Sequence, residues 1–176
     1  AMLDVFTIWE NFGDIDRLKI GIIGDLRYGR TPSSLSYALS KWNVKLYFIA
    51  PPLLQIDKRN DDMEFYLQML SVDYEKINDI RLVLPELDVL YVTRIQKERF
   101  VDPTEFEKVK GSYVITKELL KTAKKDLMIL HPLPRVDEIS PEVDSTKYAF
   151  YFKQAQNGLF VRMALLSLIL GGIDGE

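Results

Sequence analysis

Short apolar runs alternate with amphipathic stretches along the chain, and this alternation predicts an α/β protein. The strand-length runs occupy residues 19–24, 44–49, 89–93 and 127–130, with a weaker one near 72–74. Because the clear runs are apolar throughout, both of their faces should be covered, as in a parallel sheet. We expect a doubly wound, Rossmann-like fold of three layers, α/β/α, with a parallel sheet of about five strands.

Apolar residues at helical spacing fill the segments between these runs and predict the helices of the outer layers. The expected helices span residues 3–12, 31–42, 61–71, 77–84, 103–108, 116–125, 147–154 and 159–170. Thr31 is a suitable N-cap for the second helix. In the third, Met63, Tyr66, Leu67 and Leu70 share one face and should point inward.

The last predicted helix is apolar on every side, because ten of the twelve residues 159–170 are apolar. A membrane span needs about 20 such residues, so this segment predicts a buried helix. A helix of this kind needs cover all round, which a small domain does not readily supply.

Composition is that of one ordinary globular domain. The 176 residues include 23 Lys and Arg against 26 Asp and Glu, and 47% are hydrophobic, which excludes disordered, collagen-like and coiled-coil proteins. The net charge of −3 argues against a broad nucleic-acid-binding surface. Charged residues interrupt the first twenty positions, so these lack the apolar run of a secretory signal. We expect a soluble, cytoplasmic protein that binds neither nucleic acid nor membrane.

Absent residue types narrow the chemistry further. The chain has no cysteine, which excludes disulfides, a thiol nucleophile and thiolate metal sites. With His131 as its one histidine, it offers no set of metal ligands, and we expect neither metal nor cofactor. Gly21, Gly24 and Gly29 do not follow the dinucleotide-binding spacing, and no Gly-Lys-Ser/Thr phosphate loop occurs.

Polar loops follow three of the predicted strands, at residues 24–31, 93–99 and 131–138. The carboxyl ends of parallel strands meet at one edge of a sheet, where ligands bind. The loops would bring six cations to that edge: Arg27, Arg30, Arg94, Lys97, Arg99 and Arg135. Guanidinium groups bind carboxylate or phosphate through two parallel donors, so the cluster indicates an anionic ligand. The alternative is that these cations are solvated or paired with acids of the same loops.

His131 opens the third of these loops and has two interpretations. A lone histidine at a strand end can be catalytic, but it is more often a structural residue whose hydrogen bonds are satisfied within the protein. The peptide bond between Leu133 and Pro134 is a candidate for the cis form, which would turn the carbonyls of Pro132 and Leu133 toward a ligand.

The three loops carry a family resemblance. They read Gly-Asp-Leu-Arg-Tyr-Gly-Arg-Thr at 24–31, Tyr-Val-Thr-Arg-Ile-Gln-Lys-Glu-Arg at 91–99 and Leu-His-Pro-Leu-Pro-Arg-Val-Asp-Glu at 130–138. In this order they resemble the aspartate-binding half of the aspartate carbamoyltransferase catalytic chain, and the likeness runs through nearly the whole sequence.

This likeness implies that residues 1–176 form a single aspartate-binding domain. Residues 1–13 would be the remnant of a helix that joins two domains. Residues 158–172 would form a helix that packs on the other, carbamoyl phosphate-binding domain. Without that domain, we expect the closing helix to be mispacked, disordered or buried against a second molecule.

Substrate-binding roles also follow from the resemblance, position by position. Arg30 would hold the α-carboxylate of aspartate, while Arg94 and Gln96 would hold its side-chain carboxylate. Thr31 would lie beside the reacting amine. His131 would be catalytic and polarise the carbamoyl carbonyl oxygen.

Further positions would hold the carbamoyl group or support these contacts. The carbonyls of Pro132 and Leu133 would accept hydrogen bonds from the carbamoyl NH₂ group, and Glu98 would pair with Arg94. Arg99 would pair with a carboxylate of the other domain. The remaining expected site residues are Tyr28 and Pro134 as supports and Arg162 as a further substrate-binding residue.

The implied reaction is transfer of a carbamoyl group from carbamoyl phosphate to the amine of L-aspartate, giving N-carbamoyl-L-aspartate in pyrimidine biosynthesis. Positioning and stabilisation of an oxyanion would supply most of the catalysis. Expected partners are the carbamoyl phosphate-binding domain and neighbouring catalytic chains, and a regulatory chain is a further candidate. Because the family's Ser-Thr-Arg-Thr and His-Pro-Thr-Gln segments are absent, the chain alone should show little or no activity.

Two alternatives stay open. Ornithine carbamoyltransferase resembles this fold but has a cysteine in the loop matching 131–134 and binds a cationic amino acid. The lack of cysteine and the presence of Arg94 and Gln96 point away from it. The other alternative is a non-catalytic assembly or regulatory module that kept the site residues by descent. One local departure from the family, Thr-Pro-Ser-Ser at 31–34 in place of Thr-Val-His-Ser, has no evident cost.

Overall fold

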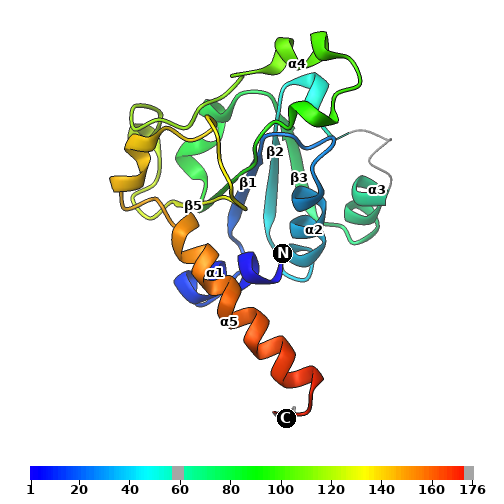
Figure 1. Ribbon diagram of the computed structural model, residues 1–176, viewed down its shortest axis with the longest axis vertical. Coiled ribbons are helices and arrows are strands. Elements are labelled where there is room, and N and C mark those ends of the chain that lie inside the picture. The colour runs from blue at the N-terminus through cyan, green and yellow to red at the C-terminus, as the bar shows by residue number, and fades with distance from the viewer. Residues whose placement is uncertain (57–61, 173–176) are drawn as a thin grey trace.

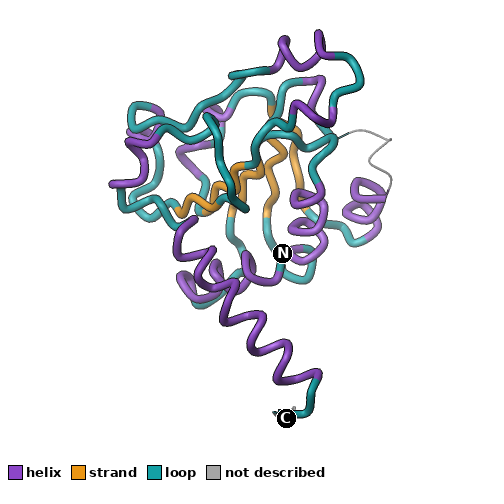
Figure 2. The backbone as a smooth tube through the Cα atoms, viewed as in Figure 1, coloured by secondary structure: helices purple, strands orange, loops and turns teal. Residues whose placement is uncertain are grey.

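A parallel sheet forms the centre of the computed structural model, which describes residues 1–56 and 62–172 (Figures 1 and 2). Within these residues the strands are β1 (Lys19–Ile23), β2 (Lys45–Ile49), β3 (Asp73–Ile77), β4 (Val89–Val92) and β5 (Met128–Leu130). Their order is β3-β2-β1-β4-β5, and every pair is parallel. The predicted doubly wound α/β fold is therefore confirmed.

Strand order and register determine where a ligand can bind. The chain builds β1, β2 and β3 outward in one direction and then returns to the other side of β1 for β4. In such sheets the loops after the two strands at this reversal separate and leave a crevice. Ile23 is level with Val92, and Tyr91 with Leu130, so the loops after β1, β4 and β5 leave the sheet at one edge.

Three helices cover one face of the sheet: α1 (Met2–Phe12), α2 (Arg30–Leu39) and α3 (Asp62–Met69). The core on this side is made by Ile8, Leu35 and Met63, which pack with Ile22 and Phe48 of the central strands. Burial of such side chains contributes about 1.5–3 kcal/mol each, so this layer fixes the position of α2 firmly. The start that the sequence predicts for α3, Asp61, lies outside the described residues.

The opposite face is covered by short 3₁₀ helices and loops, with Ile80, Leu120 and Val143 packed against Leu90 and Ile129. The described 3₁₀ segments are Pro52–Leu54, Ile80–Leu82, Leu84–Glu86, Lys97–Arg99, Leu119–Thr122 and Pro141–Ser145. The α-helices predicted for 77–84 and 116–125 were therefore wrong. In the first of these segments, β3 continues to Ile77, and Asp79 accepts a hydrogen bond from the Arg81 amide. Pro85 disfavours an α-helix that continues through Leu84, which instead begins a separate 3₁₀ turn.

Smaller differences concern the ends of helices. Thr31 is not an N-cap, because α2 begins at Arg30 and Gly29 occupies the cap position. Leu70 lies beyond the end of α3 and is exposed, whereas Met63 and Leu67 are buried as expected. Helix α4 (Pro103–Val109) agrees with prediction; its N-cap Asp102 accepts from the Thr104 amide at 2.8 Å.

The two closing helices predicted from sequence are one continuous helix, α5 (Tyr151–Ile169). Gly158 lies between the two predicted segments and is buried inside the continuous helix. A Cβ atom at Gly158 would lie 3.4 Å from Leu3 Cδ2, an ordinary van der Waals distance, so this turn of α5 lies directly against α1.

The second half of α5 extends away from the body of the molecule (Figure 1). Its exposed apolar residues are Leu159, Phe160, Met163, Leu166, Leu168 and Ile169. No helix among the described residues is long and apolar enough to cross a membrane. The helix is thus not packed wholly on its own sheet, and its apolar surface is open to a covering molecule.

Candidate functional site

A cavity of about 280 Å³ lies where the loops after β1, β4 and β5 meet. Its walls are Asp25, Gly29, Arg30, Thr31, Thr93, Arg94, Gln96, Arg99, His131, Pro132, Leu133 and Pro134. All three loops singled out in the sequence therefore contribute to one site. It contains every residue expected to touch substrate except Arg162, which is exposed on α5 and does not line the cavity.

Close packing between the first two loops fixes this edge of the sheet. Gly24 has φ +131°, and a Cβ atom there would lie 2.3 Å from both the carbonyl oxygen and Oγ1 of Thr93. Thr93 Oγ1 donates to the Ile23 carbonyl at 3.1 Å, so the loops after β1 and β4 are tied at their first residues. Only glycine fits this contact and conformation.

The first loop then turns sharply into α2. Asp25 Oδ1 accepts a hydrogen bond from the Tyr28 amide, three residues on, at 2.8 Å and thereby closes this turn. The turn brings Arg30 and Thr31 to the cavity as the first residues of the helix. A helix N-terminus carries a partial positive charge, so this end of the cavity favours an anion even before the arginines are counted.

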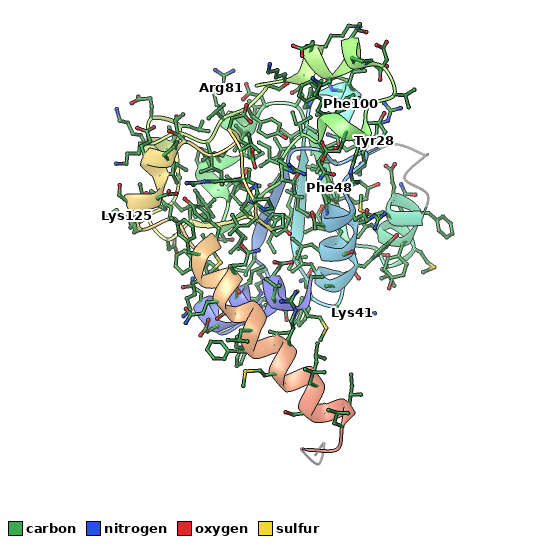
Figure 3. All side chains as sticks on the ribbon, in the orientation of Figure 1. Tyr28, Lys41, Phe48, Arg81, Phe100 and Lys125 are labelled. Atoms are coloured by element: carbon green, nitrogen blue, oxygen red, sulfur yellow. The ribbon has the colours of Figure 1, made fainter. Side chains whose placement is uncertain are left out.

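Three arginines form the cationic part of the cavity. Arg94 Nη2 pairs with Glu98 Oε1 at 2.9 Å, as the sequence resemblance implied, and a half-exposed ion pair of this kind can exchange its carboxylate for a ligand's. Arg99 Nη1 donates to the Tyr28 carbonyl, and Arg30 is exposed at the rim. The Tyr28 ring also packs edge-on against the Phe100 ring, with 5.5 Å between the ring centroids. Both residues are labelled in Figure 3.

The other three predicted cations do not face this cavity. Arg27 donates to the Leu53 carbonyl at 3.2 Å, and Lys97 lies over the Phe106 ring. Arg135 donates to Asp144 and to the Tyr151 hydroxyl. The expected cluster of six cations is therefore reduced to three, because the rest are bound to other groups of the protein.

One acidic residue, Asp25, lies among these arginines and is 1% exposed. Burial raises the pKa of its carboxyl, and the Tyr28 amide and the Arg99 charge only partly offset this. Gln96 Oε1 is also buried and has no hydrogen-bond partner within residues 1–56 and 62–172. Buried polar atoms of this kind are characteristic of ligand sites, where a bound molecule supplies the missing partner.

The loop after β5 forms the wall opposite the arginines. Leu133 has φ +49°, and the Leu133–Pro134 peptide bond is cis. His131 Nδ1 accepts a hydrogen bond from the Leu133 amide at 2.8 Å, and His131 Nε2 lies 2.6 Å from Glu138 Oε1. Because Nδ1 is the acceptor, Nε2 carries the proton and donates to Glu138.

This geometry differs from the role that the resemblance gives to His131. The side chain is 1% exposed, and both ring nitrogens are engaged inside the protein, so neither faces a ligand carbonyl. Burial alone would raise the pKa of Glu138, but the His131 ring and the Val136 amide hold it below its usual range. The ionised Glu138 thus fixes the ring, and the arrangement is that of a structural histidine.

Sequence reasoning missed Gln154, whose Oε1 accepts from the His131 amide at 2.8 Å. Gln154 is 1% exposed although it is polar. A usable signal was present, because Gln154 and Asn157 are polar residues at i and i+3 on the buried side of α5. Asp25 and Thr93 also line the cavity, and neither had been assigned a role there.

Comparison with known proteins identifies the family of the chain. Residues 16–169 match the family model "Aspartate/ornithine carbamoyltransferase, Asp/Orn binding domain". The aspartate carbamoyltransferase catalytic subunit of Korarchaeum cryptofilum is 54% identical over 171 residues, which are 97% of this chain and 55% of that protein. The subunit of Thermococcus kodakarensis is likewise 54% identical, with 54% of its length covered.

Solved structures agree as well. The catalytic subunit of M. jannaschii aspartate transcarbamoylase is 46% identical with a TM-score of 0.88, over 98% of this chain and 56% of that one. Aspartate transcarbamoylase from Trypanosoma cruzi in complex with aspartate and phosphate is 34% identical with a TM-score of 0.80, over 94% and 51%. The chain spans about half the length of these relatives. It belongs to the aspartate/ornithine carbamoyltransferase family and contains that family's Asp/Orn binding domain.

Proposed function

We propose that this chain is the aspartate-binding half of an aspartate carbamoyltransferase. In the proposed reaction the amine of L-aspartate attacks the carbonyl carbon of carbamoyl phosphate, giving N-carbamoyl-L-aspartate and phosphate. The observation that carries the proposal is the single cavity that joins Arg30, Arg94 and Arg99 to the loop 131–134. A dicarboxylate fits such a site because each carboxylate can pair with one planar guanidinium group.

In this proposal each wall of the cavity holds one part of the reactants. Arg30 holds one carboxylate of aspartate at the N-terminus of α2, with Thr31 beside the amine. Arg94 and Gln96 hold the other carboxylate, and Glu98 keeps Arg94 in place until the ligand arrives. The carbonyl oxygens of residues 132 and 133 accept from the carbamoyl NH₂ group on the opposite wall.

His131 has a positioning role in this account. Its ring holds the backbone of the loop through the Leu133 amide and does not polarise the substrate. The donor that stabilises the developing oxyanion must then come from groups outside this chain. Such a donor supplies a large part of the catalysis in acyl-transfer reactions, so the chain alone should turn over little or no substrate.

A second domain is proposed to complete the site by packing on α1 and α5. Between these helices lies an apolar groove of about 390 Å³, lined by Met2, Phe6, Phe160, Val161, Ala164, Leu165 and Leu168. The relatives are about twice as long as this chain, which fits a carbamoyl phosphate-binding half on that surface. In this proposal residues 1–13 and 158–172 are the contacts between the halves, and neighbouring catalytic chains and a regulatory chain are further partners.

Calorimetric titration of the chain tests the choice of ligand. Succinate and L-aspartate should bind competitively, because succinate retains both carboxylates and lacks only the amine. L-Ornithine should give no binding heat at tenfold higher concentration, since three guanidinium groups repel its second ammonium group. Saturable ornithine binding with no response to succinate would instead favour the ornithine member of the family. A non-catalytic module would bind neither amino acid, or would bind aspartate and gain no activity when the other half is added.

A further inference from the structure

The substrate loop is tied to the helix pair α1–α5 through one buried side chain. Gln154 of α5 accepts from the His131 amide at 2.8 Å through Oε1, and its Nε2 donates to Asp4 Oδ1 of α1 at 2.5 Å. The three residues are 1%, 2% and 4% exposed. Asp4 and Gln154, which are 150 positions apart in the sequence, are thereby joined to His131, the first residue of the loop that lines the cavity.

The direction of these hydrogen bonds is fixed. The His131 backbone amide can only donate, and the Asp4 carboxylate oxygen accepts, so the Gln154 side-chain amide cannot turn over without losing both bonds. A buried donor or acceptor left without its partner costs far more than the bond itself contributes. The position of Gln154 on α5 therefore determines where the His131 backbone can lie.

Beyond His131, the loop is held as a unit. The His131 ring accepts from the Leu133 amide, and Glu138 holds the ring and accepts from the Val136 and Asp137 amides at 3.1 Å. A displacement of the His131 backbone must therefore move the carbonyls of residues 132 and 133 with it. Helix α5 is bonded to the His131 amide of this loop through the Gln154 side chain.

We propose that Gln154 is a positioning residue that couples the substrate loop to the helix pair α1–α5. The inference rests on the proposed function, because it takes the carbonyls of residues 132 and 133 as the carbamoyl-binding groups. Any molecule that packs on α1 and α5 and shifts them relative to the sheet changes the loop through this contact. Among the described residues, Arg30, Arg94 and Arg99 make no side-chain hydrogen bond to α1 or α5. Carbamoyl binding should therefore depend on Gln154 much more strongly than dicarboxylate binding does.

The seam between α1 and α5 offers a matched control. Asn157 is 2% exposed, one turn further along α5, and its Nδ2 donates to Thr7 Oγ1 at 3.0 Å and Glu10 Oε2 at 2.9 Å. Its side chain joins the same two helices, and among the described residues it forms no hydrogen bond with the loop. Gln154→Leu and Asn157→Leu should therefore lower stability similarly, and only Gln154→Leu should affect the loop.

The test measures carbamoyl aspartate formation by this chain mixed with the separately made carbamoyl phosphate-binding half, alongside amide hydrogen exchange of the chain alone. Gln154→Leu should lower kcat by about 10- to 100-fold, raise the KM for carbamoyl phosphate, and speed exchange of the His131 amide at least tenfold. Succinate affinity should stay within about twofold. Asn157→Leu should keep kcat within about threefold.

A double variant separates positioning from simple loss of stability. Gln154→Glu alone places the new carboxylate beside that of Asp4, and the two negative charges repel each other. Gln154→Glu combined with Asp4→Asn restores the hydrogen bonds, because the glutamate accepts from the His131 amide and from the asparagine NH₂ group. The double variant should recover most of the lost activity. The coupling would be overturned if Gln154→Leu kept the wild-type kcat and the wild-type exchange rate of the His131 amide. It would also be overturned if the double variant recovered none of the lost activity. If the wild-type mixture itself makes no product, the proposed function fails, and the His131 exchange rate alone decides for or against the coupling.

Discussion

Arg94→Ala is expected to weaken succinate binding at least 100-fold. A guanidinium that grips a carboxylate through two charge-assisted hydrogen bonds contributes about 3 kcal/mol or more, which corresponds to a factor of about 100 or more in affinity. The variant also removes the ion-pair partner of Glu98, and the uncompensated negative charge of Glu98 opposes binding of an anion nearby. The fold should survive, because Arg94 is half-buried in the loop after β4 and its ion-pair partner, Glu98, is exposed.

Calorimetric titration with succinate measures this effect, and thermal melting confirms the fold. Arg81→Ala is the matched control: Arg81 is an exposed arginine paired with Asp79 and lies well away from the labelled Tyr28 and Phe100 (Figure 3). It should bind succinate like the wild type. Arg94→Lys should remain at least tenfold weaker than wild type, because an ammonium group lacks the planar fork. An unchanged titration in a folded Arg94→Ala variant contradicts the assigned site.

Gly24→Ala should destabilise the chain by about 3–5 kcal/mol, or about 10 °C in melting temperature for a domain of this size. The φ of +131° is unfavourable for any residue with a Cβ atom, and that atom would overlap the Thr93 carbonyl. This overlap can be relieved only if the loops after β1 and β4 move apart. The cavity between them should then lose its shape, and succinate affinity should fall together with stability.

Gly13→Ala provides the control for this substitution. Gly13 also has a positive φ, +76°, but a Cβ atom there has nothing within 4 Å. Gly13→Ala should lower the free energy of unfolding by about 1 kcal/mol, which reflects the unfavourable backbone conformation alone. Melting curves of the two variants separate the conformational cost from the steric one. Equal melting temperatures for both would mean that the contact between Gly24 and Thr93 does not constrain the site.

Much of the fold was predictable because its signals are local. The apolar runs at 19–24 and 89–93 became β1 and β4 almost residue for residue, since a buried parallel strand must be apolar on both faces. The loops at their ends could likewise be assigned to one sheet edge. The 3₁₀ helices at Ile80–Leu82 and Leu119–Thr122 could not be distinguished from α-helices in the sequence, because a single helical turn and a short α-helix have the same apolar spacing.

The site shows the same division between local and distant information. That Arg30 and Arg94 share a cavity follows from strand order, which the alternation of elements already implied. Arg135 pairs with Asp144 and does not face the cavity, and the His131 ring is hydrogen-bonded to Glu138. Neither contact could be predicted, because the positions of Asp144 and Glu138 are defined only in the folded loop. Gln154 lies 23 residues beyond His131, and no spacing rule links a helix side chain to a loop amide.

Carbamoyl aspartate formation, measured with this chain alone and after addition of the carbamoyl phosphate-binding half, tests the central claim most directly. The chain alone should give no product above the uncatalysed background, because the proposed function assigns phosphate binding and polarisation of the carbonyl to groups outside this chain. The mixture should give steady turnover that saturates with L-aspartate and is inhibited by succinate. Robust turnover by the chain alone, or a mixture whose halves associate and yet make no carbamoyl aspartate, would contradict the account.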